Sequence, residues 1–291
     1  MNHSCMDYRS INLNAACTEQ FGIGWGPTRT SEHLWSWRAV AAGQPPQNID
    51  LKRAVNRQCG PDYKLVHIGT HAYDWRAFAP MGQSHYVLPV MQIAFDWFYD
   101  WAAVRNAVEN FNSAIATIRE FYRLQTGKTF KPLPTICQYT GLTADQWYNL
   151  AQLSLYDAHR AKYGDQSIEI LKAGFDGVMN PNLIYLITQF CGPNPASKIS
   201  PFGAINKGNF CVVPATVCLE QRTTADPNDF SALYAVGHEL GHAFGLPHSE
   251  TLNPRPDNYG DSIMQWGWNG KHNAILLDSE KTKLLQSPYF F

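Results

Sequence analysis

Charged side chains are scarce in this chain. They make up 16% of its 291 residues, the formal net charge at pH 7 is −1, and no block of like charge occurs. Phosphate backbones and anionic membranes attract proteins through clustered lysines and arginines. We therefore expect no nucleic-acid partner and no electrostatic attachment to a membrane.

Long apolar runs are also missing. The strongest one, Leu183 to Ile187, is far shorter than the roughly 20 residues that a helix needs to cross a bilayer. The hydrophobic fraction of 45% is nevertheless enough for a large core. These observations predict a soluble protein of one or two domains with no membrane span, and we favour a monomer.

The seven cysteines include no C-x-x-C pair, which disfavours a cysteine-based zinc module or a thioredoxin-like site. Disulfides are the better interpretation, with one thiol left over, and the low charge agrees with a secreted, extracellular protein. No basic, apolar leader opens the numbering, which leaves open a removed signal peptide or another route of secretion. Cys211 and Cys218, seven residues apart across Pro214, are a candidate short-loop disulfide.

Residues 1–85 differ from the rest in composition and periodicity: they are rich in tryptophan, glycine and proline, and their apolar residues show little periodicity. We predict irregular or short-stranded structure there, as a propeptide or an accessory module. The cluster Trp25, Trp35 and Trp37 suits either a binding platform or a core, and the core is favoured. His67 and His71 are four residues apart, but no carboxylate completes a second metal site.

Residues 86–291 show regular periodicity and form the second predicted domain. Apolar residues recur every three or four positions from Val104 to Phe121, as one face of a helix requires. Thr143 and Gln146 have the spacing of a capping box at the start of a second helix. Further helices are predicted over 143–162, 228–244 and 278–287, and strands over 129–139, 182–190 and 210–213, the first of them irregular or at an edge because of its prolines.

The segment from His238 to His248 fits H-E-x-x-H-x-x-G-x-x-H at all of its fixed positions. His238 and His242 lie one turn apart on a helix, so both imidazoles can reach one ion. Glu239 is rotated away from the ion but can accept a proton from a water on it. Gly245 permits the left-handed turn that returns His248 to the same ion.

Three neutral nitrogen ligands leave a fourth coordination position open, which is typical of a catalytic zinc site. The motif therefore predicts a Zn²⁺-dependent endopeptidase acting on a polypeptide substrate, with His238, His242 and His248 as ligands and Glu239 activating the zinc-bound water. The alternative is ordinary histidines on an amphipathic helix. Five specified residues at this spacing arise by chance in on the order of one chain in 10⁵ or fewer.

This extended motif resembles the zinc-binding consensus of the metzincin metallopeptidases. Met264, which follows His248 by 16 residues, is similar in spacing to the methionine of that clan's Met-turn. The resemblance covers residues 90–291. It implies an α+β fold with a twisted mixed sheet, two long helices, the Met-turn beneath the metal and a C-terminal helix.

Within the clan, Ser249 resembles the serine that follows the third histidine in matrixins. Trp266 stands where astacins and serralysins carry a zinc-approaching tyrosine, so that tyrosine is excluded here. Tyr259 or the indole of Trp266 are candidate donors to an oxyanion. No subfamily is assigned.

The resemblance also implies a substrate strand and an inhibitory segment. Substrate would lie antiparallel to an edge strand, for which 199–205 and 210–213 are candidates, and residues 265–273 would wall an apolar pocket. The sequence around Cys59 is similar to the matrixin propeptide, in which a thiolate occupies the fourth zinc position. A disulfide at Cys59 is the favoured alternative.

Two rival functions remain open from the sequence. One is a zinc amidase or deacetylase that acts on a non-peptide substrate. The other is a binding protein with a vestigial zinc site, although such a protein has no physical need for Glu239.

Overall fold

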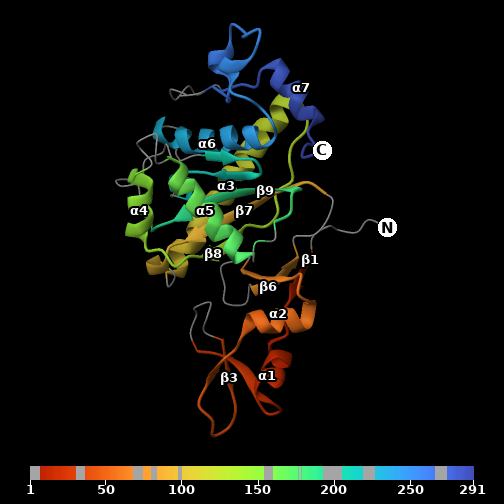
Figure 1. Ribbon diagram of the computed structural model, residues 1–291, viewed down its shortest axis with the longest axis vertical. Helices are drawn as coiled ribbons and strands as arrows, with labels where there is room; N and C mark the ends of the chain where they lie inside the picture. The colour runs from red at the N-terminus through yellow and green to blue at the C-terminus, as the bar shows by residue number, and fades with distance from the viewer. Residues whose placement is uncertain are drawn as a thin grey trace.

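The structure is a computed structural model of the chain. It describes residues 7–30, 37–67, 75–79, 84–97, 100–153, 160–175, 177, 179–192, 205–218, 227–265 and 274–291. Over these ranges the chain forms seven α-helices and two β-sheets, a mixed architecture compatible with the predicted α+β class. Figure 1 shows an elongated molecule with the larger sheet across its middle.

The larger sheet has eight strands in the order β1-β6-β5-β8-β7-β9-β11-β10. Four adjacent strands, β8, β7, β9 and β11, run parallel to one another. The strand pairs on either side of this group are antiparallel. In chain order the strands are β1 (Asp7–Ser10), β5 (Lys64–His67), β6 (Trp75–Ala79), β7 (Tyr86–Ile93), β8 (Ile136–Tyr139), β9 (Leu183–Phe190), β10 (Ile205–Lys207) and β11 (Phe210–Val212).

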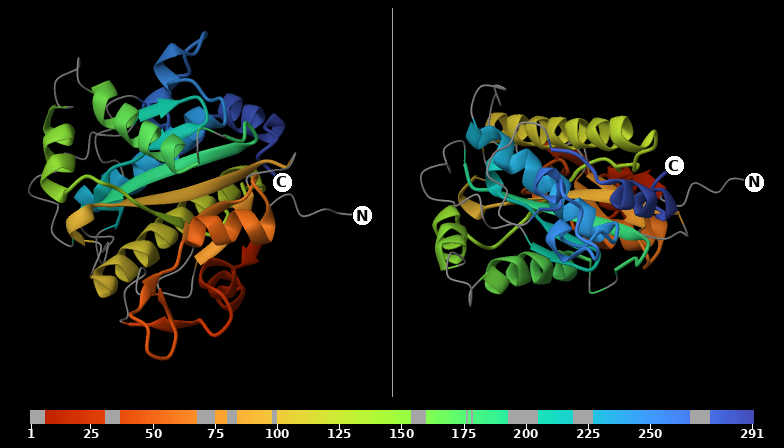
Figure 2. Two further views of the ribbon diagram at one scale, coloured as in Figure 1. Left: turned by 60° about the horizontal axis from the view of Figure 1, so that its bottom comes forward. Right: turned by 90° about the horizontal axis from the view of Figure 1, so that it is seen from above.

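Helices cover both faces of this sheet (Figure 2). Helices α3 (Trp101–Thr126), α6 (Pro227–Ala243) and α7 (Asp278–Gln286) pack on one face, where Met91 of β7 is fully buried. Helices α4 (Ala144–Leu153) and α5 (Arg160–Gly174) pack on the other, against its neighbour Val90. Strands covered on both faces need apolar sequence, which β9 has from Leu183 to Ile187. The buried Thr188 and Gln189 that follow are hydrogen-bonded to Pro214 and Ser167.

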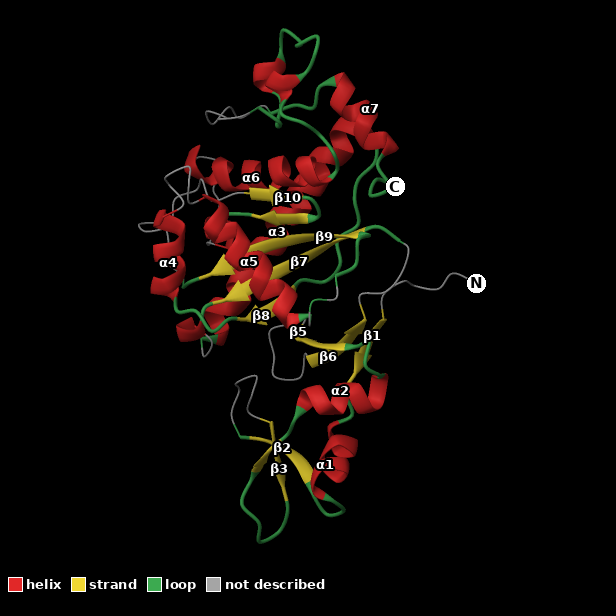
Figure 3. Cartoon of the chain, viewed as in Figure 1, coloured by secondary structure: helices red, strands yellow, loops and turns green. Residues whose placement is uncertain are grey.

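A smaller sheet lies at the end of the molecule away from α6 (Figure 3). It contains β2 (Gly26–Arg29), β3 (Trp37–Val40) and β4 (Gln47–Asn48), beside α1 (Leu13–Phe21) and α2 (Leu51–Cys59). The short strands agree with the prediction for residues 1–85, whereas the two helices were not predicted. Strands β1, β5 and β6 of this region extend the main sheet, and the division at residue 85 stays a prediction.

Most of the predicted regular elements are confirmed. The capping box is formed, because the backbone amide of Gln146 donates to the Thr143 hydroxyl and the backbone amide of Thr143 donates to the side-chain oxygen of Gln146. The predicted strand over 129–139 is reduced to β8, which lies between β5 and β7 and is therefore internal. Pro132 and Pro134 precede β8, and Pro132 forms an isolated parallel bridge with Val87. Helix α5 was missed because Ser167 interrupts the apolar row between Tyr163 and Leu171.

The disulfide prediction is wrong for the cysteines that the structure describes. Cys211 and Cys218 are not bonded to each other, and no disulfide joins any of the six described cysteines. Cys211 contacts the backbone of α6 instead, and Cys218 lies against Thr188 and Met91. Cys5 falls outside the described ranges. Among the helices the structure describes, none is long and apolar enough to cross a membrane.

Of the two candidate substrate-binding edges, 210–213 is excluded. Phe210–Val212 form β11, which is paired on both sides by β9 and β10. The edge is β10, because β11 is its one partner in the described part of the sheet. Of the other candidate, 199–205, only Ile205 lies inside the described ranges.

Candidate metal centre

Helix α6 presents His238 and His242 one turn apart, and it ends where the motif predicts. Gly245 has a φ of 97°, and its amide donates to the carbonyl of His242 at 2.9 Å. The Leu246 amide donates to the Gly241 carbonyl at 2.9 Å. These two bonds form a Schellman motif, which reverses the chain so that His248 returns to the helix.

The three imidazoles converge on one point. The Nε2 atom of His242 lies 3.1 Å from the Nε2 atoms of both His238 and His248. Zinc–nitrogen bonds of about 2.0–2.1 Å at tetrahedral angles separate two ligand atoms by about 3.3 Å. The donor set therefore fits one tetrahedral ion, and no other such group of His, Cys, Asp and Glu occurs in the described residues.

Backbone carbonyls hold two of the rings in a metal-binding orientation. His238 Nδ1 lies 2.8 Å from the carbonyl oxygen of Ile263, and His242 Nδ1 lies 2.8 Å from that of Leu246. A carbonyl only accepts, so Nδ1 carries the proton and Nε2 keeps its lone pair for a cation. Burial lowers the pKa of His238 to about 4 and lowers that of His242, which favours the neutral ligand form.

Glu239 lies beside the histidines but outside their ligand group. Its exposed fraction is 7%, and burial raises its pKa to about 8. Burial disfavours the charged form of this carboxyl group, which makes its carboxylate a stronger base than that of an exposed glutamate. The arrangement therefore suits a proton acceptor next to a metal rather than a fourth ligand.

The predicted Met-turn residue packs beneath the histidine helix. Met264 is fully buried, and a Cβ atom added to Gly241 would overlap its sulfur. The same helix face is fixed one turn earlier, where the Tyr122 hydroxyl donates to the Gly237 carbonyl at 2.7 Å. Glycine at position 241 thus permits the close approach of α6 to the turn.

A buried polar network that the sequence did not reveal supports this turn. The Ser262 hydroxyl donates to Glu280 at 2.7 Å and accepts from the Met264 amide at 2.9 Å. Glu280, in the first turn of α7, also accepts from the Leu277 amide at 2.7 Å. The sequence shows that Ser262 lies two residues before Met264. It does not show that Glu280 is their partner, because this carboxylate is remote in the sequence.

Ser249, the residue after the third histidine, is fully buried and ties two segments together. Its amide donates to the Met264 carbonyl at 3.1 Å, and its hydroxyl donates to the Tyr259 carbonyl at 3.0 Å. The Tyr259 ring lies 4.6 Å from the guanidinium of Arg255, and its role as an oxyanion donor stays a prediction. Trp266 lies outside the described residues.

Cys59 does not reach the metal centre in this structure. It is the last residue of α2, which packs against β5, whereas α6 packs against β10 and β11. Four strand spacings separate β5 from β11, or about 19 Å. The thiol is therefore remote from the fourth coordination position, and the latency hypothesis finds no support here.

His67 lies buried in β5 against Trp75, with 5.1 Å between the ring centroids. His71 falls outside the described ranges. Trp25 contacts Phe21 at a centroid distance of 5.3 Å but is only half-buried, so the prediction that it belongs to the core is not met. Trp37 is in β3, and Trp35 is not among the described residues.

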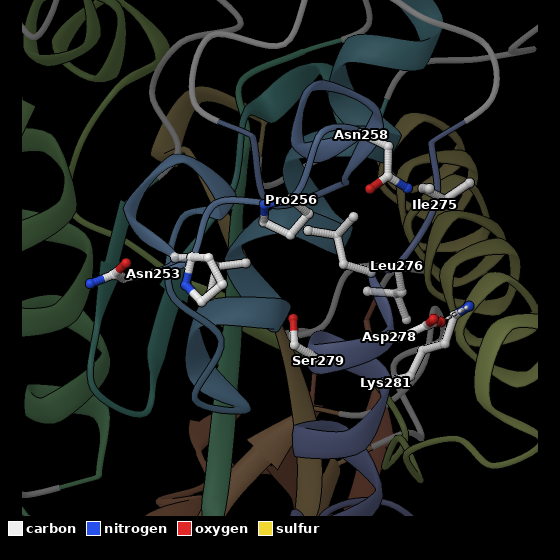
Figure 4. A pocket seen from close by; sticks show the side chains of 11 residues that line it. Asn253, Pro256, Asn258, Ile275, Leu276, Asp278, Ser279 and Lys281 are labelled. Carbon is white, nitrogen blue, oxygen red and sulfur yellow. Dashed lines mark hydrogen bonds and ion pairs between the residues drawn. The ribbon is translucent and has the colours of Figure 1, made fainter.

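A pocket of about 470 Å³ lies between the chain that leaves His248 and the start of α7 (Figure 4). Pro256 and Leu276 face its hollow, and Ser279 and Asp278 border it on the side of α7. None of the three histidines lines it. The pocket is therefore separate from the metal centre.

No protein-family model matches the chain, and no curated protein matches it. Among solved structures, the chain is similar to archaemetzincin from Methanopyrus kandleri. The identity is 15% and the TM-score 0.34, with 69% of this chain and 94% of that chain covered.

Proposed function

We propose that the protein is a zinc-dependent endopeptidase. The observation that carries this proposal is the convergence of three Nε2 atoms beside a buried glutamate that is not itself a ligand. The sequence motif supports it independently, because its spacing is set by the same geometry. The metzincin clan is the family we propose, on the motif and Met264 alone.

His238, His242 and His248 would hold the ion through their Nε2 atoms. Zn²⁺ is the metal that suits three neutral imidazoles with an open position, and it acidifies water and polarises a substrate carbonyl when bound. The carbonyls of Ile263 and Leu246 keep two of these imidazoles in the required tautomer.

Glu239 would move the proton in the reaction. Its carboxylate accepts a proton from the attacking water and then gives it to the amine that leaves when the peptide bond breaks. Its burial excludes bulk water from the carboxylate, which strengthens the hydrogen bond to a single positioned water. A glutamine at this position keeps the shape but cannot accept the proton.

Strand β10 would bind the polypeptide. An extended peptide can add to the open side of a sheet edge through main-chain hydrogen bonds that do not depend on side-chain identity. In the described part of the sheet β10 offers this side, and it packs against α6, the helix that carries His238 and His242. This suits an enzyme that cleaves within a chain.

The test is incubation of the zinc-loaded protein with a denatured protein, followed by mass spectrometry of the fragments. We expect internal cleavage that a chelator stops and zinc restores, and that Glu239→Gln abolishes. Release of small acyl groups without chain cleavage would instead favour the amidase or deacetylase. Binding of the polypeptide with no new termini would favour the binding protein.

A further inference from the structure

The hairpin of β10 and β11 touches the backbone of Glu239 directly. The Cys211 sulfur lies 3.3 Å from the Glu239 carbonyl oxygen and is oriented to donate to it. The Asn206 side-chain amide lies 3.5 Å from the same oxygen and 3.4 Å from the Cys211 sulfur. Two side chains from one hairpin therefore meet at the carbonyl of the proposed proton acceptor.

The strand register explains why these two side chains act together. Asn206 and Cys211 are directly opposite each other in the antiparallel pair, so both point to the same face of the sheet. That face is the one covered by α6, since Cys211 belongs to the core that includes Leu240. Lys207 alternates to the opposite face, where it pairs with Asp165 of α5.

The Glu239 carbonyl can accept these bonds without losing its place in the helix. A carbonyl oxygen has two lone pairs, and the Ala243 amide of the α-helix uses one of them. Cys211 is fully buried, and burial raises the pKa of its thiol well above the usual range, so the proton remains available for donation. The second lone pair is thus directed at the hairpin.

We propose that Asn206 and Cys211 are positioning residues that fix Glu239 through its carbonyl and couple the substrate-binding edge to the proton acceptor. This inference rests on the proposed function. Tyr122 and Met264 contact α6 at Gly237 and Gly241. The β10–β11 hairpin supplies the third point of attachment, at Glu239, which lies midway between these two glycines in the sequence.

The coupling between peptide binding at β10 and the position of Glu239 follows from the place of Asn206 in the middle of β10. A peptide that adds to β10 orders the backbone from which the Asn206 side chain projects. The same side chain then holds the Glu239 carbonyl, so that binding at the edge aligns the carboxylate with the bond to be cut. Truncation of this contact is expected to lower kcat more than it alters KM.

The variants Cys211→Ala and Cys211→Ser test the contact, with Cys218→Ala as the matched control. Cys218 is a buried thiol of the same core, and its sulfur lies against Thr188 and Met91. We expect Cys211→Ala to lower kcat about tenfold or more at unchanged KM and zinc content. Serine keeps a donor and should restore most of the rate, and Asn206→Ala should lower kcat as well.

Hydrogen exchange provides a readout that does not require activity. In Cys211→Ala the amide of Ala243 should exchange faster than in the parent and in Cys218→Ala, because its acceptor is less firmly held. Equal kcat losses in Cys211→Ala and Cys218→Ala, or loss of zinc in the former, would overturn the inference. If the parent cleaves no polypeptide, the proposed function fails, and unchanged exchange at Ala243 separately disproves the contact.

Discussion

The sulfur of Met264 lies against the Cα atom of Gly241, so that a single added methyl group would overlap it. This contact joins the turn that contains Met264 to the middle of the motif that contains the three histidines. It also explains in physical terms why the residue just before the second histidine of this chain is a glycine.

Gly241→Ala should destabilise the protein by about 1–3 kcal/mol, because an added methyl group in a filled core displaces its neighbours. Met264→Ala should also destabilise it, through the cavity it leaves. The double variant should lose less than the sum of the two, since the cavity accepts the new methyl group. Urea unfolding of all four proteins measures this coupling, and strict additivity would contradict the contact.

Gly245→Ala should weaken both folding and zinc binding. An alanine at a φ of 97° costs on the order of 1–3 kcal/mol, and the turn there positions His248. Gly127→Ala is the matched control, because Gly127 ends α3 at a φ of 75° and lies outside the metal site. Both variants should lose stability, and only the first should lose zinc affinity in a competition with a chelating dye.

Glu280 should make stability depend on pH with a sign opposite to that of most carboxylates. Burial is the main cause that raises its pKa, with Glu250 adding to it, while the bonds from Leu277 and Ser262 and the charge of Lys281 oppose it. The folded state thus favours the protonated form. The free energy of unfolding falls as pH rises from the ordinary glutamate pKa to the raised value in the folded protein.

Glu280→Gln removes this dependence, so the free energy of unfolding of the variant minus that of the parent should increase as pH rises through that window. Urea unfolding of the metal-free proteins at several pH values measures the difference, in which other titrating groups cancel. Glu120→Gln is the control, because the exposed Glu120 pairs with Arg123 and its pKa is lowered. A constant difference for Glu280→Gln would rule out the assigned pKa direction.

The metal centre was largely predictable from the sequence, because all three histidines lie within one helix and the turn after it. Local geometry alone brings His238, His242 and His248 together. Helix α3 was predictable for a similar reason, since its buried face repeats at three- and four-residue steps. The turn of Met264 was found through its resemblance to a known motif.

The supporting contacts were not predictable, since each joins residues that are distant in the sequence. Glu280 reaches Ser262 only once α7 has packed, and Cys211 reaches Glu239 only once the hairpin has joined the sheet. The disulfide prediction failed because an odd number of cysteines without a spacing motif does not specify pairing. Strand order, which makes β10 the edge, is likewise a property of the assembled sheet.

One ion held by the three histidines, with Glu239 as proton acceptor, is proposed to cleave polypeptides. The most direct measurement is a titration of the metal-free chain with zinc, recording bound metal and the rate of peptide cleavage together. The parent should bind one zinc per chain at this site and reach its full rate at that point, Glu239→Gln should bind the zinc but not cleave, and His242→Ala should do neither. Cleavage by Glu239→Gln at the rate of the parent, or full activity of His242→Ala, would contradict the account.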